Sequence, residues 1–113
     1  MDVNRLFDPT NPGEQETYEF DFSLDMDVDG GETLISATWE CTVRSGIDAG
    51  AAAHIGNGAS PPSGATISLD GLRTQQACQG FLAGVVYILT ARVVTSMGNT
   101  KILYAGLPCE AIA

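Results

Sequence analysis

The chain has 113 residues, enough for one domain with a modest core, and it is strongly acidic, with 14 Asp+Glu against 5 Lys+Arg. Nucleic acids and anionic membrane surfaces are bound through Lys and Arg, so this balance argues against both as partners. Eight of the acids lie between Glu14 and Glu32, a window with no basic residue. We expect them to form a solvated face or to meet a basic partner surface.

Residues 1–13 predict an extended N-terminal arm. They lack the basic start and apolar run of a signal peptide, and they contain Pro9 and Pro12, which favour turns over regular structure. Leu6 and Phe7 are adjacent apolar residues that cannot form a core of their own. They either fold back on this chain or dock on a neighbouring subunit. We favour the neighbour, because the edge strands of a sheet accept added segments.

From residue 14 onward the chain predicts short strands. Glu14–Phe22 alternates apolar and polar residues at its end, and Leu34–Arg44 alternates along its whole length. Because successive side chains of a strand leave opposite faces, this pattern indicates a strand with one buried face. The predicted buried face of Leu34–Arg44 carries Ile35, Ala37, Trp39, Cys41 and Val43.

The stretch between these two strands, Asp25–Glu32, reads DMDVDGGE and resembles the first half of a calcium-binding EF-hand loop. Such a loop needs a glutamate at its twelfth position, which here is Ser36, inside the predicted strand. We therefore expect no metal site, with the aspartates facing solvent or a basic partner and Gly30–Glu32 forming a hairpin corner. A calcium-specific rise in melting temperature that magnesium does not reproduce would contradict this.

The middle of the chain, Ser45–Gly64, is rich in Gly, Ala, Ser and Pro and predicts a loop. Ala49–Ile55 could make a helical turn, but glycines bracket it and we do not predict one. A short strand follows over Ala65–Leu69. A turn at Asp70-Gly71 then leads into a more polar strand over Arg73–Cys78.

Val85–Ser96 is the second strong strand, apolar on one face and partly apolar on the other, so it is either central in the domain or covered by a partner. Met97–Asn99 predicts a turn, so Thr100–Leu107 should pair with this strand as a hairpin that Pro108 ends. With no convincing helix, residues 14–113 predict one all-β domain. Its about six to eight strands would form an antiparallel β-sandwich.

No constellation predicts catalysis. His54 is the only histidine and lies in the Gly/Ala-rich loop without a predictable acid or nucleophile partner, so we interpret it as a surface residue. No glycine-rich loop opens a helix, and we expect no cofactor. Cys41, Cys78 and Cys109 form no C-x-x-C pair and are interpreted as small apolar residues of a protein made in a reducing cytoplasm. An intermolecular disulfide through Cys78 or Cys109 stays open.

A resemblance to a known family rests on two patterns. The first pattern lies in the segment Gly31–Val43 and consists of Gly31, Glu32, Thr33, Ser36 and Trp39. The second lies in the segment Gly80–Leu103 and consists of Gly84, Tyr87, Leu89, Ala91, Val93, Thr95 and Gly98. Gly84 and Tyr87 are also similar to the G-x-x-Y corner of immunoglobulin-like sandwiches, in which the tyrosine ties back to the preceding loop. Over residues 14–107 the chain resembles small immunoglobulin-like virion proteins of tailed bacteriophages, the fibre–tail adaptor and related neck or tail proteins.

The resemblance implies an immunoglobulin-like sandwich in which Trp39, Tyr87 and Gly84 define the fold. It implies a structural role in the virion, as an adaptor among tail, neck or fibre proteins, with homo-oligomers in a symmetric assembly and no enzymatic activity. The loop Ser45–Gly64 and the cysteines depart from the family pattern. Two other classes stay open: a capsid decoration protein and a cell-surface or glycan-binding sandwich. The glycan-binding class is weakened because this loop has no aromatic residue.

Overall fold

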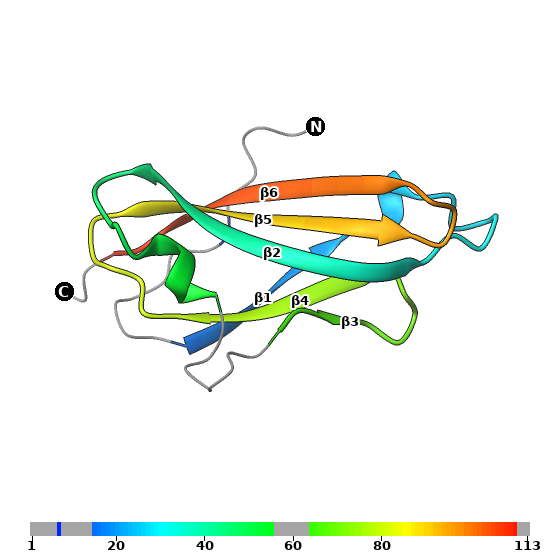
Figure 1. Cartoon of the computed structure of the whole chain (residues 1–113), viewed down its shortest axis with the longest axis horizontal. Helices are drawn as coiled ribbons and strands as arrows, with labels where there is room; N and C mark the ends of the chain where they lie inside the picture. The colour runs from blue at the N-terminus through cyan, green and yellow to red at the C-terminus, as the bar shows by residue number, and fades with distance from the viewer. Residues whose placement is uncertain (1–6, 8–14, 56–63, 111–113) are drawn as a thin grey trace.

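The computed structural model describes residue 7, residues 15–55 and residues 64–110. It is all-β, with two antiparallel sheets of three strands each that lie one above the other (Figure 1). One sheet has the order β1-β4-β3 and the other the order β2-β5-β6. The strands are β1 (Gln15–Asp21), β2 (Leu34–Ser45), β3 (Thr66–Ile67), β4 (Arg73–Gln79), β5 (Val86–Thr95) and β6 (Thr100–Pro108). The predicted all-β class with antiparallel pairing is therefore confirmed.

Two short 3-10 helices interrupt the connections, η1 (Ser23–Asp25) and η2 (Ala51–His54). η2 lies in the region predicted to be a loop, where a helical turn was not predicted. The turns predicted between β3 and β4 and between β5 and β6 are present. Gly71 and Gly98 occupy them with φ of 72° and 79°, a backbone conformation that favours glycine.

The core lies between the two sheets. Inward positions recur at every second residue of β5, which is the middle strand of its sheet, and of the neighbouring strands. The largest fully buried side chains are Tyr87, Phe20, Phe22, Phe81, Leu89, Leu107 and Val93. Burial of such side chains is the main favourable term for a domain of this size.

The beginning of β2 differs from the prediction. Ile35 was expected on the buried face, but its side chain is 63% exposed, whereas Leu34 is 6% exposed. The pairing with β5 shifts between Leu34 and Ser36, which marks a β-bulge. Because a bulge adds one residue to a strand, the alternation changes phase there. The leucine therefore enters the core and the isoleucine faces outward.

The connection between β1 and β2 also differs from the prediction. The two strands belong to different sheets, so Gly30–Glu32 is not the corner of a hairpin. The segment is instead a loop that crosses from one sheet to the other (Figure 1). It closes on itself where Asp27 C=O accepts hydrogen bonds from the Gly30 and Glu32 N–H groups, at 3.1 and 3.0 Å.

Phe7 lies on this chain's own sandwich, which differs from the expectation that Leu6 and Phe7 would dock on a neighbour. Its N–H donates to Gly106 C=O of β6 at 2.8 Å. Its ring lies 5.0 Å from that of Tyr18 and 5.3 Å from that of Phe20, both on β1. Phe7 therefore joins the edge of one sheet to the core face of the other. Leu6 lies outside the described residues.

We expect Phe7→Ala to lower the free energy of unfolding by about 1–3 kcal/mol. This is less than the cost for a fully buried phenylalanine, because the ring is only half-buried. Urea unfolding of the full chain measures this, with Leu24→Ala as the control, since the Leu24 side chain is 97% exposed. If Phe7→Ala left the stability unchanged but reduced the size of the oligomer, Phe7 would instead be a residue that docks on a neighbouring subunit.

Candidate functional site

Trp39 lies in the middle of β2 and is 8% exposed. Its ring lies 4.9 Å from the ring of Phe20 in the opposite sheet. Its Nε1–H donates to Thr74 Oγ1 at 3.2 Å, and the Thr74 hydroxyl donates to Thr66 C=O at 2.8 Å. The buried indole therefore finds the polar partner that it needs. Through this chain of contacts Trp39 connects β2 to β4 and β3 across the core.

Tyr87 and Gly84 form the corner where the chain enters β5. The Tyr87 ring is fully buried, and its hydroxyl accepts a hydrogen bond from Leu82 N–H at 2.8 Å, so the side chain ties back to the preceding loop. Gly84 has φ of 80°, and a side chain placed there would meet no atom within 4 Å. Glycine is therefore favoured at this position by its backbone conformation and not by lack of space.

Tyr87 also belongs to a polar cluster with Asp48 and His54. Asp48 Oδ2 accepts hydrogen bonds from the Tyr87 hydroxyl at 2.7 Å and from His54 Nε2 at 2.5 Å. The imidazole ring lies 5.2 Å from the ring of Phe81 and 5.5 Å from that of Tyr87. The interpretation of His54 as a surface residue without an acid partner is therefore wrong. Its side chain is only 12% exposed.

The chemistry of this cluster is that of a structural anchor. The hydrogen bonds from Tyr87 and His54 lower the pKa of Asp48, so the carboxylate stays ionised. Burial, followed by the hydrogen bond to Asp48, raises the pKa of Tyr87, so its hydroxyl stays protonated. Tyr87 is thus a hydrogen-bond donor and not a nucleophile. The cluster holds η2 and its preceding loop against the end of β5.

The side chains of the acidic loop Asp25–Glu32 point in different directions or bond within the loop. In the part of the chain that the structure describes, no group of three or more His, Cys, Asp or Glu side chains is placed to hold a metal ion. Asp25, Asp27 and Asp29 are exposed. Asp27 Oδ1 instead accepts a hydrogen bond from Gly30 N–H at 2.9 Å, which stabilises the turn.

Glu32 differs from the aspartates because it is buried, with 3% of the residue exposed. Its carboxylate accepts hydrogen bonds from the Thr95 hydroxyl at 2.5 Å, from Asp27 N–H at 2.7 Å and from Asn99 Nδ2 at 3.0 Å. These contacts join the β1–β2 loop to the β5–β6 turn. They lower the pKa of Glu32 from 4.5 to about 2, with the Thr95 hydrogen bond as the largest cause.

The lowered pKa of Glu32 predicts how stability depends on pH. A carboxyl whose pKa is lower in the folded state stabilises the fold fully above its unfolded pKa, and this stabilisation is lost as the pH falls through the folded value. We expect a loss of stability between about pH 4.5 and pH 2. Glu32→Gln should lower the melting temperature at pH 7 and flatten the decline in that window.

Glu110→Gln is the matched control for this prediction, because Glu110 is an exposed glutamate that follows β6. It should leave both the melting temperature at pH 7 and the acid decline close to those of the parent. Differential scanning calorimetry from pH 2 to pH 7 measures the three proteins. Equal acid profiles of the parent and Glu32→Gln would show that the Glu32 contacts contribute nothing.

The cysteines are buried in the core. Cys41, Cys78 and Cys109 are 3%, 0% and 2% exposed, so in this fold neither Cys78 nor Cys109 reaches a second chain to form the disulfide that the sequence left open. Burial raises the pKa of Cys41 to about 12, which keeps the thiol protonated and unreactive.

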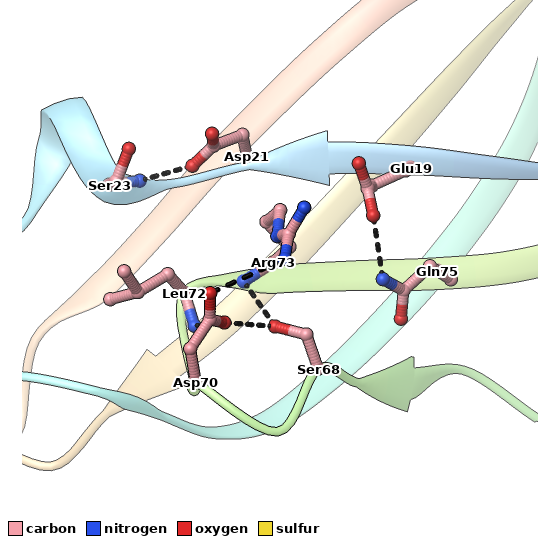
Figure 2. Close-up of polar contacts among 8 residues, drawn as sticks. All are labelled: Glu19, Asp21, Ser23, Ser68, Asp70, Leu72, Arg73 and Gln75. Atoms are coloured by element: carbon pink, nitrogen blue, oxygen red, sulfur yellow. Dashed lines mark hydrogen bonds and ion pairs between the residues drawn. The ribbon is translucent and has the colours of Figure 1, made fainter.

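The outer face of the β1-β4-β3 sheet is polar and internally bonded (Figure 2). Gln75 Nε2 donates to Glu19 Oε1 at 2.7 Å, from β4 to β1. At the β3–β4 turn the Asp70 carboxylate accepts hydrogen bonds from the Ser68 hydroxyl and from the Leu72 N–H group. It also forms an ion pair with Arg73 at 3.3 Å. The ion pair is exposed and therefore contributes little to stability. This face has the character of a solvated surface.

Comparisons with protein-family models, with curated proteins and with solved structures found no match for this chain. Among the described residues, no helix has the length and apolar character required to span a bilayer. The two polar clusters of the described chain hold loops together.

Proposed function

We propose that the chain is an immunoglobulin-like domain that serves as a structural protein in the virion of a tailed bacteriophage. The role is that of an adaptor in the tail, neck or fibre-attachment region, without catalytic activity, cofactor or metal. The fold assignment is the first step of this proposal. The role is the second.

The strand order supports the fold assignment. Immunoglobulin domains place strands B, E and D in one sheet and C, F and G in the other. The orders β1-β4-β3 and β2-β5-β6 follow this scheme when β1 is taken as B. Trp39 then occupies the position of the tryptophan of strand C, and Tyr87 that of the tyrosine at the start of strand F. Phe7 donates its N–H to Gly106 of β6, the strand that corresponds to G.

The inter-sheet disulfide of antibody domains has no counterpart between these strands. In antibody domains the second cysteine lies two residues after the corner tyrosine, which here is Leu89. Trp39 packs on the ring of Phe20 instead. A core closed by aromatic contacts suits a protein made in a reducing cytoplasm, where disulfides do not persist.

The observation that carries the proposed role is the pairing of this strand order with the two sequence patterns around Trp39 and Tyr87, which resemble those of the phage adaptor proteins. Fold alone does not determine function. The polar clusters support a structural role, because Glu32 and Asp48 are each engaged in holding loops. A capsid decoration protein remains the second candidate, since it would use the same kind of domain.

Immunogold labelling of tailed particles with antibodies against the purified protein tests this role. The proposal expects label at the head–tail junction, along the tail or at fibre attachment sites. Label over the capsid shell would instead support the decoration protein. The absence of the protein from purified particles by mass spectrometry would overturn both. Selective binding on a glycan array would favour the glycan-binding class.

A further inference from the structure

The outer face of the β2-β5-β6 sheet differs from the polar face in Figure 2, because its β5 and β6 strands carry exposed apolar side chains, whereas the outward residues of β2 after Ile35 are polar or charged. Tyr87, Leu89, Ala91 and Val93 point into the core, so the alternate residues of β5 point outward, and the register places their β6 partners on the same side. Val94 and Ile102 are 39% and 38% exposed, and the bulge adds Ile35 at 63%. The other apolar residues at outward positions of β5 and β6 are Val86, Ile88, Tyr104 and Pro108.

This face also has an unusual charge for the protein. The whole chain has a net charge of -9. At outward positions of β2, β5 and β6 the charged residues are one acid, Glu40, and two bases, Arg92 and Arg44, the latter at the bulge between Val43 and Ser45. Within the described chain the ion pairs are those of His54 with Asp48 and of Arg73 with Asp70, so neither Glu40 nor Arg92 is engaged in one. A face that carries exposed apolar side chains and no excess of acids is where a highly acidic protein can approach its own copy.

The register orders these side chains in rows across the sheet. One row contains Glu40, Thr90 and Tyr104, and the next contains Thr38, Arg92 and Ile102. Beyond the first row lies Ile88, and beyond the second lies Val94. Successive rows are about 7 Å apart, because each is two residues along the strands.

We propose that this face is the contact between two copies of the chain, related by a two-fold axis that crosses the strands between the Thr90 row and the Arg92 row. Such an axis exchanges the two rows. It places Ile102 over Tyr104 of the second copy, and Val94 over Ile88. Arg92 then lies beside Glu40 of the second copy, and the symmetry repeats each contact.

The arrangement satisfies the general requirements of a two-fold interface. A two-fold contact is self-complementary, so each apolar or charged group must find its complement on the same surface. Sheets pack face to face in nearly aligned orientations, which keeps the rows of the two copies in correspondence. The acids of the β1-β4-β3 sheet lie in the opposite layer, which limits repulsion between the copies.

The contact deepens the proposed function and rests on it for its biological role, since it gives the adaptor a dimeric unit. The two are tested separately. Dimerisation is measured on the purified full chain, whereas the proposed function depends on where the protein lies in a particle. A monomer found in tail particles would contradict only the contact, and a dimer absent from particles would contradict only the function.

Sedimentation equilibrium from about 1 to 500 µM, a range that brackets the affinities of small interfaces, is expected to show a monomer–dimer equilibrium. Val94→Asp and Ile102→Asp should each weaken dimerisation by at least about tenfold, because a carboxylate would be buried against an apolar partner. Leu69→Asp is the control, since Leu69 is fully exposed at the β3–β4 turn and should dimerise like the parent. Circular dichroism and melting temperatures check that each variant is folded.

A mixing experiment tests the predicted pairing. Glu40→Arg and Arg92→Glu should each weaken self-association by at least about tenfold, because each creates like-charge contacts across the axis. Mixed together, the two folded variants should form a heterodimer, since every contact is then between opposite charges. A monomer at all concentrations, a dimer unaffected by the Val94 and Ile102 variants, or no heterodimer on mixing would overturn the proposal. If the protein is a monomer at all concentrations, this face is available to bind a different protein.

Discussion

Trp39→Ala is expected to lower the free energy of unfolding by about 3–5 kcal/mol, the largest effect of any single substitution considered. The indole fills the space between the sheets against Phe20 and anchors Thr74 on β4. Its removal leaves a cavity that the two sheets cannot close without moving. A domain of this size is stable by about 5–15 kcal/mol, so the variant should be close to unfolding at 37 °C. Urea unfolding followed by circular dichroism measures the loss.

Two further variants separate the packing of Trp39 from its hydrogen bond. Trp39→Phe keeps an aromatic ring against Phe20 but removes the donor, so it should cost less than the alanine. Thr74→Val keeps the shape of the side chain but leaves Nε1–H of Trp39 without its acceptor, at an expected cost of about 1–3 kcal/mol. If Trp39→Ala unfolds at the same urea concentration as the parent, Trp39 does not hold the sheets together.

The strands could be predicted because their signal is local. β2 alternates apolar and polar residues and β5 has one face that is apolar along its length, and the pleat of a strand converts such a pattern directly into a buried and an exposed face. The turns predicted at Gly71 and Gly98 are present, although the strand predicted over Ala65–Leu69 is reduced to Thr66–Ile67. An all-β sandwich then follows, because each strand has one face to bury.

The features that the sequence did not predict depend on contacts between distant segments. The bulge that exchanges Leu34 and Ile35 is set by pairing with β5, about 60 residues later. Alternation within β2 says nothing of it. The partner of β1 could not be inferred either, because strand order depends on how all six strands share two sheets. The hairpin corner expected at Gly30–Glu32 was wrong for this reason.

The two polar clusters could not be found from spacing. Glu32 looked like one more acid of an acidic loop. Thr95 is 63 residues away in the sequence, but folding places the Thr95 hydroxyl 2.5 Å from the Glu32 carboxylate. His54 looked isolated because Asp48 is six residues away in a loop without a predictable path. A carboxylate buried in this way must be hydrogen-bonded. The available signal in the sequence was that each of these acids, Glu32 and Asp48, lies close to an end of β2.

These clusters explain how a small domain supports long connections. The β1–β2 loop is attached to the β5–β6 turn by Glu32, and the β2–β3 loop is attached to the β5 corner by Asp48. Both carboxylates bind groups of β5 or its flanking turns. β5, the central strand of the β2-β5-β6 sheet, therefore holds a loop at each of its two ends. A surface built on this strand, such as the proposed two-fold contact, is presented on a fixed support.

Tyr87→Phe is expected to cost about 1–3 kcal/mol at pH 7, although it removes a single oxygen atom. That oxygen accepts from Leu82 N–H and donates to Asp48, so its loss leaves Leu82 N–H without its acceptor and removes one of the donors to the Asp48 carboxylate. The hydrogen bond from Tyr87 is also the largest cause of the lowered pKa of Asp48. In the variant this pKa should rise toward 3.8, which carbon NMR of the carboxyl group can measure.

The pH dependence distinguishes this account from a simple packing defect. In the parent, the stabilisation from the lowered pKa of Asp48 is present above pH 3.8 and is lost as the pH falls below it. The variant has less of this stabilisation to lose, so the difference in stability between the two proteins should shrink on acidification. Thr17→Val, which removes a hydroxyl at an exposed position of β1, is the control and should match the parent at every pH. A constant difference from pH 7 to pH 2, or an unchanged Asp48 pKa, would show that the Tyr87 hydroxyl does not anchor the loop.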